Sequence, residues 1–209
     1  MRLPFACLTL LAALSACSAS PSGQQVTVAG VTALTDADAA TIHRRMDDDG
    51  LLAFLHPATT LAVRDGSLVV HAGSASTSDD DLRYLLGHQG AFTVTSQFGR
   101  VWLDGSGIAD IRANMGQDSN PVLIVSLTHE GQQRLARFAN RDAVGSRILV
   151  KLDDETISSA ALMGPLEGEH FQVGLRRPVH EVVLMADLIR SGALSFRPGD
   201  VTVAPGARN

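Results

Sequence analysis

PVLIVSLTHEGQQRLARF, residues 121–138, is the stretch that decides the fold of the second half of the chain. It opens with a continuous apolar run, which predicts a strand buried at the centre of a sheet. Thr128 then stands where a helix N-cap is expected, and the helix continues through Ala139 with Leu135 and Phe138 on its buried side. The stretch therefore predicts a central strand followed by a helix that packs on the sheet.

Downstream of this helix, the sequence predicts a hairpin, one more strand and a last helix. Arg147–Leu152 and Thr156–Leu162 alternate between apolar and polar residues around Asp153-Asp154-Glu155, which is typical of a hairpin. Phe171–Leu175 predicts a strand. The last helix begins at Pro178, carries an apolar stripe and ends before Gly192, because proline favours the first helical turn and glycine the position after the last.

Upstream of residue 121, the pattern predicts a short strand at 101–103, a loop at 105–107 and a short helix at 108–115. Residues 197–209, beyond the last helix, are expected to form a tail. Together these elements predict an α+β subdomain over residues 100–196, built on a mainly antiparallel sheet.

The first half of the chain, residues 26–96, predicts the order strand, helix, strand, strand, helix, strand. An Asp-Gly pair, Asp65-Gly66, joins the second and third strands and is a strong hairpin signal. This βαββαβ order is that of the ferredoxin-like fold. The expected elements are residues 26–31, 35–50, 59–64, 67–72, 78 to 87 or 90, and 91–95.

Three stretches of the second half, in order, resemble the head subdomain of the first periplasmic domain of SecD, part of the SecDF protein-export factor. They are residues 121–138, GSRILVKLDDETISS at 145–159 and DLIRSGAL at 187–194. The resemblance implies a ferredoxin-like base at 26–96, a head at 100–196, contact with emerging polypeptide and no catalytic residue. The chain departs from the family at Asp153-Asp154-Glu155, where the family hairpin has Asp-Gly, and at Ala160-Ala161, where it has Ala-Pro.

The N-terminal residues predict where the protein is located in the cell. Arg2 and the apolar run Leu8–Leu14 are typical of a secretory signal, and Leu14-Ser15-Ala16-Cys17 resembles the bacterial lipobox. We therefore expect a signal peptide at 1–16, lipidation at Cys17 and a tether at 17–25. The alternative is an ordinary signal peptide with an incidental cysteine. Ser18 favours the outer over the inner membrane for this periplasm-facing lipoprotein.

Composition excludes several classes of function. A net charge of −5 and an aromatic content of 4% argue against nucleic-acid binding. None of the seven histidines pairs with another histidine or a cysteine at helical ligand spacing, and nucleophile elbows and phosphate loops are absent. The sequence predicts a non-enzymatic protein without metal or cofactor.

Three hypotheses about function remain open. The first is a lipid-anchored module that binds proteins or unfolded polypeptide in export or envelope assembly, with a client strand added to a sheet edge. The second is a structural lipoprotein that packs in a membrane complex through a flat surface. The third is an enzyme or small-ligand protein with a pocket between base and head.

Overall fold

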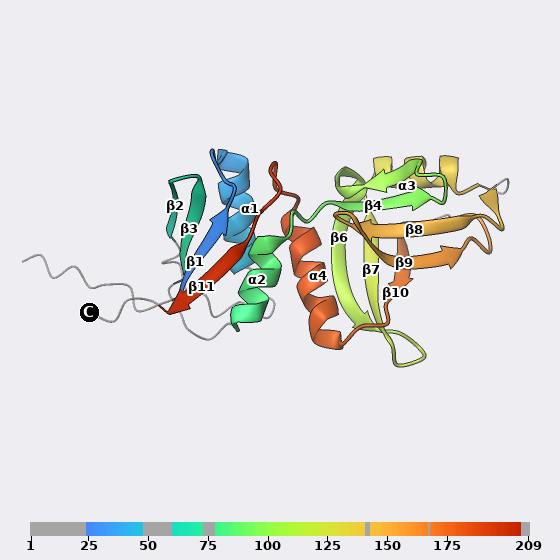
Figure 1. Cartoon of the computed structure of the whole chain (residues 1–209). Helices are drawn as coiled ribbons and strands as arrows, with labels where there is room; N and C mark the ends of the chain where they lie inside the picture. Colours follow the sequence, from blue (N-terminus) through green and yellow to red (C-terminus); the bar gives the residue numbers. More distant parts are fainter. Residues whose placement is uncertain (1–23, 48–59, 73–77, 141–142, 167, 206–209) are drawn as a thin grey trace, which may run out of the picture.

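The computed structural model describes residues 24–47, 60–72, 78–140, 143–166 and 168–205. These residues form two α+β bodies with one helix, α4 (Val179–Ser191), between them (Figure 1). We call the body that holds the first strands the base and the other body the head. The predicted α+β class is confirmed, and every pair of strands in the described part of the chain is antiparallel.

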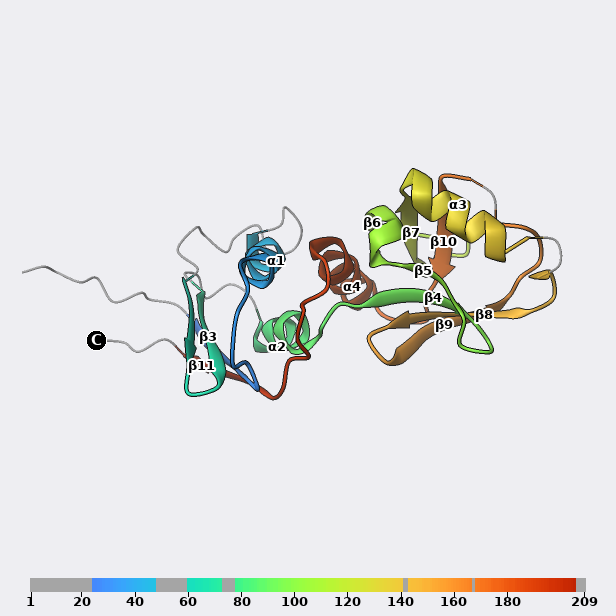
Figure 2. The same ribbon diagram turned by 90° about the horizontal axis from the view of Figure 1, so that it is seen from above.

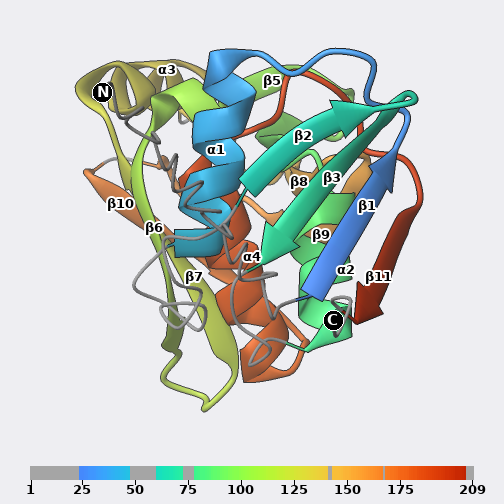
Figure 3. The same cartoon turned by 90° about the vertical axis from the view of Figure 1, so that its left-hand side faces the viewer.

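The base is a four-stranded sheet with two helices on one face (Figure 3). Its strand order is β11-β1-β3-β2. Val26 and Val28 point toward the helices and are buried, while Thr27 between them faces the other way. The elements are β1 (Gln24–Ala29), β2 (Thr60–Arg64), β3 (Ser67–Ala72), β11 (Val201–Pro205), α1 (Asp36–Asp47) and α2 (Asp79–Gly87).

Two predictions about the base are wrong. Residues 91–95 were predicted as its last strand, but β4 (Phe92–Ser96) pairs with strands of the head instead. Part of the predicted tail, residues 197–209, forms β11, which pairs with β1 from Gln24↔Pro205 to Val28↔Val201. The head is therefore inserted into the base between α2 and β11, and β11 completes the βαββαβ order of the base.

The head has two sheets with the orders β5-β4-β8-β9 and β10-β7-β6. The apolar run at 121–127 is confirmed as a central strand, β7, with a neighbour on each side. The Thr128 hydroxyl caps the following helix by accepting a bond from the Gly131 amide (3.0 Å). The remaining elements are β5 (Val101–Asp104), η1 (Gly105–Gly107), β6 (Ile108–Met115), β7 (Pro121–Leu127), α3 (His129–Phe138), β8 (Arg147–Leu152), β9 (Glu155–Ala161) and β10 (His170–Gly174).

The short helix predicted at 108–115 is wrong, because these residues form strand β6. The register with β7 shifts between Ile108 and Asp110, as in a β-bulge. Such a bulge breaks the period-two alternation of a strand. Ile108 is half-buried and Ile111 is buried, so the apolar positions of β6 do not alternate regularly along the strand.

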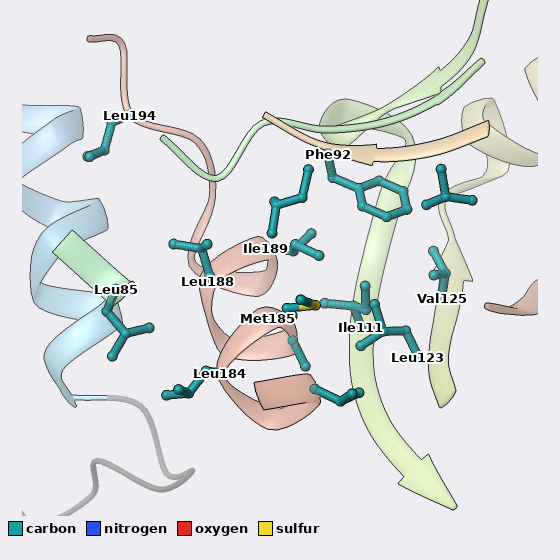
Figure 4. Packing of buried hydrophobic residues seen from close by; sticks show 14 of the residues in the cluster. Leu85, Phe92, Ile111, Leu123, Val125, Leu184, Met185, Leu188, Ile189 and Leu194 are labelled. Atoms are coloured by element: carbon teal, nitrogen blue, oxygen red, sulfur yellow. The ribbon is translucent and has the colours of Figure 1, made fainter. Parts of the chain in front are cut away.

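Helix α4 joins the two bodies through one continuous core. It packs on α1 and α2 of the base and on β6 and β7 of the head. Leu184 and Leu188 point toward the base, while Met185 and Ile189 point toward the head strands (Figure 4). All four side chains are buried, so the apolar cores of the base and the head are continuous through α4.

Candidate functional site

Two segments, residues 85–91 and 191–195, join the base to the head, and we call them the neck. The buried side chain of Arg45 binds both segments. Arg45, on α1, is fully buried, and its guanidinium donates to the carbonyls of Leu85, His88, Gln89 and Gly192. Its Nε also donates to the Ser191 hydroxyl (3.2 Å). Burial lowers the pKa of Arg45 to about 10, so the side chain stays charged at neutral pH.

Two carboxylates, one from the head and one from the base, accept hydrogen bonds from the two segments of the neck. Asp153, in the β8–β9 turn, accepts bonds from the amides of Gln89 (3.1 Å) and Ala91 (2.8 Å). Asp38, on α1, accepts from the amide and hydroxyl of Ser195, each at 2.7 Å. Burial alone would raise the pKa of Asp38, but the bonds from Ser195 and Thr35 outweigh it and hold that pKa at about 2. These carboxylates are structural groups.

A cavity of about 490 Å³ lies beside the neck, where the hypothesis of a small-ligand site places a pocket. Its carboxylates are already paired, Asp104 with Arg134 (2.9 Å) and Asp110 with Arg112 (2.6 Å). The bond from Arg134 holds the pKa of Asp104 below its usual value. A paired, ionised carboxylate is a poor general acid, so the cavity offers little chemistry. Its lining is residues 90–93, 104–106, 108–110, 189–190 and 192–193.

The far end of the head carries the most exposed apolar side chains of the described residues. Phe98 and Met163 are each 87% exposed, and Val101 and Val144 are also exposed. Backbone bonds bring their loops together, from the Gln97 amide to Arg147 and from the Gly145 amide to Leu162. We call Phe98, Val101, Val144 and Met163 the head tip. The turn between β4 and β5 and the segment between α3 and β8, which carry Phe98 and Val144, lie at the end of the head away from the base (Figure 2).

Beside the head tip is a groove of about 360 Å³ between the β4–β5 turn and the end of α3. Trp102 forms part of its wall and is buried. The guanidinium carbon of Arg100 lies over the Phe138 ring, 4.3 Å from the ring centre. Strand β5 is an edge of its sheet. We call this feature the tip groove; its lining is Ser96, Phe98, Arg100, Trp102, Arg137, Phe138, Asn140, Ala143 and Ser146. A shallow, partly aromatic groove beside a sheet edge suits an extended chain.

The predicted site residues are placed as follows. Cys17, with the expected signal peptide and most of the tether, lies outside the described residues, as does His56. The described histidines are not brought together, and no group of three metal-ligating side chains occurs within the part of the chain that the structure describes. His180 bonds to Asp81 at 2.7 Å. No pattern in the sequence singled out Phe98 or Met163, because exposure of a lone apolar residue leaves no periodic signal.

Comparison with known families gives one match that covers more than half of the chain. Residues 81–196 match the family described as SecDF, P1 head subdomain. The protein translocase subunit SecD of Acidaminococcus fermentans is 26% identical over 113 residues, which is 54% of this chain and 27% of that protein. SecD of Dictyoglomus turgidum is 27% identical over 111 residues, 53% of this chain and 27% of that protein. The chain thus matches about a quarter of the length of these curated relatives.

Two solved structures share the fold. A crystal structure of SecDF in its super-membrane-facing form has a TM-score of 0.72 at 17% identity and covers 87% of this chain and 30% of that one. A structure of the membrane component SecDF that enhances protein export has a TM-score of 0.67 at 16% identity and covers 84% of this chain and 96% of that one. None of the helices among the described residues has the length and apolarity to cross a membrane.

Proposed function

Because this chain belongs to the SecDF P1 head subdomain family, we propose that it is a non-enzymatic module that binds unfolded polypeptide in association with protein export. One relative is a membrane component that enhances protein export. The observation that carries the proposal is the head tip, whose two most exposed side chains are apolar and 87% accessible. Apolar side chains exposed together at one end of a folded domain are typical of an interaction surface.

The tip groove and the edge strand β5 suggest how an unfolded polypeptide binds. An extended polypeptide pairs its backbone with β5, an edge strand of its sheet, and this pairing demands little of the client's sequence. Its apolar side chains then cover Phe98 and Met163. This division gives broad recognition, since main-chain bonds are the same for every client.

Replacing Phe98 and Met163 together with serine should weaken binding of an unfolded polypeptide about tenfold or more. Each side chain loses an apolar contact worth about 1–2 kcal/mol when covered. Both are exposed, so the melting temperature should stay within about 2 °C of the parent. The measurement is the affinity for a reduced, permanently unfolded protein by fluorescence anisotropy.

The matched control is Met115→Ser, which removes a half-exposed methionine at the end of β6, outside the groove. This variant should bind like the parent. Equal affinity of the Phe98/Met163 double variant and the parent would contradict the proposed surface.

We also propose that a lipid on Cys17 holds the domain at the periplasmic face of a bacterial membrane. The proposal rests on the lipobox Leu14-Ser15-Ala16-Cys17 and the signal-like run before it. From Cys17 to Gln24, where β1 begins, the chain can extend about 25 Å at most, which would keep the base near the membrane. Preference for the outer membrane rests on Ser18 alone, and separation of the two membranes decides it.

Cys17→Ser should move the protein from the membrane fraction to the soluble periplasm. The reason is that the thiol of Cys17 is the acyl acceptor of the lipobox, so the serine variant would carry no lipid there. Fractionation and the unfolding temperature of the released protein check this together. Retention of the serine variant in the membrane fraction would contradict the anchor.

One observation favours the structural alternative. The face of the base sheet opposite its helices is turned to the viewer in Figure 3, and Arg64 is the one charged side chain on it among the described strands. The other residues of this face are Gln25, Thr27, Ala29, Thr60, Ala62, Ser67, Val69, His71, Thr202 and Ala204. Its span of four strands by five residues is about 300 Å², below what a stable protein interface needs per partner. We therefore rank docking through this face second.

A further inference from the structure

The tip groove is positively charged although the chain as a whole is acidic. Arg100 and Arg137 line the groove, and Arg147 lies next to it at the start of β8. All three are exposed, and none forms an ion pair with a described residue. The described side chains of the groove and head tip include no carboxylate. The whole chain, these arginines included, carries a net charge of −5.

Arg100 is held in a geometry that suits a carboxylate. Its guanidinium carbon lies over the Phe138 ring, 4.3 Å from the ring centre. A guanidinium held against an aromatic ring in this way can bind a carboxylate through two parallel N–H bonds. Arg137, one residue before Phe138 in the last turn of α3, adds a second positive charge to the same groove.

Apolar side chains border these cations. Phe98 lines the groove, and Val101 is exposed one residue after Arg100. A ligand that satisfies both features carries an anionic group next to an aliphatic or aromatic group. A neutral apolar segment would leave the arginines unpaired, and a basic segment would be repelled by them.

We propose that the tip groove selects segments of unfolded polypeptide in which aspartate or glutamate stands beside a large apolar residue. This inference rests on the proposed function and names the class of segment that the head prefers. A bilayer surface with anionic headgroups shares the same chemistry. The groove lies beside β5, an edge strand, which favours a peptide, because an extended chain can pair its backbone with a strand edge whereas a bilayer cannot.

The only tryptophan of the chain lies in the groove, which makes the test direct. The full chain in detergent is titrated with two short, end-blocked peptides that lack tryptophan and tyrosine, while the fluorescence of Trp102 is followed. One peptide alternates glutamate with leucine, and the other has lysine in place of each glutamate. The acidic peptide should change the fluorescence and bind at least about tenfold more tightly than the basic one.

Salt and charge variants complete the test. Raising salt from about 0.1 M to about 1 M shortens the screening length from about 10 to about 3 Å and should weaken binding of the acidic peptide. The double variant Arg100→Gln/Arg137→Gln should bind it about tenfold more weakly. The control Arg64→Gln/Arg83→Gln removes the same charge from β2 and α2 of the base and should bind like the parent.

Equal binding of the two peptides, or full binding by the Arg100/Arg137 variant, would overturn the inference. So would a fluorescence change with vesicles of anionic lipid but none with the acidic peptide. A different result would contradict the proposed function itself, namely that no unfolded polypeptide binds, whatever its charge. If unfolded polypeptide binds, depends on Phe98 and Met163, and shows no charge preference, only the charge selection is wrong.

Discussion

Replacing Arg45 with methionine should lower the free energy of unfolding by about 3–5 kcal/mol. The arginine is fully buried and serves four backbone carbonyls and one hydroxyl at the neck. Methionine fills much of the volume but leaves those acceptors without donors and without water. Unfolding in urea, followed by circular dichroism, gives the free energy.

Arg44→Met is the matched control. Arg44 is the neighbouring residue on α1, is exposed, and makes two bonds, to the Ser191 carbonyl (3.0 Å) and the Thr41 hydroxyl (2.8 Å). Since water can replace its donors, this variant should cost about 1 kcal/mol. Equal losses for the two variants would show that Arg45 does not hold the neck.

A chain that ends at Arg197 should lose the order of the base. This truncation removes β11, which pairs with β1 over five residues and places Val201 and Val203 against the core. The two half-buried valines and the lost pairing together are worth about 3–5 kcal/mol. Hydrogen exchange at the amides of β1 is the measurement, because β1 then becomes an unprotected edge.

The control for this prediction is a chain that ends at Pro205. It removes residues 206–209 and keeps all of β11. Its β1 amides should exchange as slowly as those of the full chain. If the chain that ends at Arg197 behaved in the same way, β11 would not be part of the base.

The sequence predicts where the helices and strands of this fold lie better than it predicts which strands pair with each other. The apolar run at 121–127 and the Thr128 cap identify β7 and α3, because both signals are local. The wrong strand in the base has a different cause. Periodicity shows that residues 91–95 form a strand, but it does not show that β1 pairs with residues 201–205 instead. Pairing across an inserted domain leaves no local pattern.

The neck was hidden for a similar reason. Arg45 and Asp38 sit on an amphipathic helix, where polar residues normally face water, and their partners lie elsewhere in the chain. Asp153-Asp154-Glu155 was predicted as the turn of a hairpin; the turn is confirmed, yet Asp153 also accepts bonds from the Gln89 and Ala91 amides of the neck. The arginines of the tip groove come from a turn and a helix end and converge only in the folded head.

Photo-crosslinking in living cells tests the central claim most directly. A photoactivatable amino acid is placed at Phe98 in the head tip and, in a second strain, at Thr202 on the face of the base sheet opposite its helices. The account predicts that position 98 captures newly made exported polypeptides, with a smear of products that vanishes when export is blocked, and that position 202 does not. A single membrane partner captured from position 202, with no polypeptide from position 98, would contradict it and favour the structural alternative.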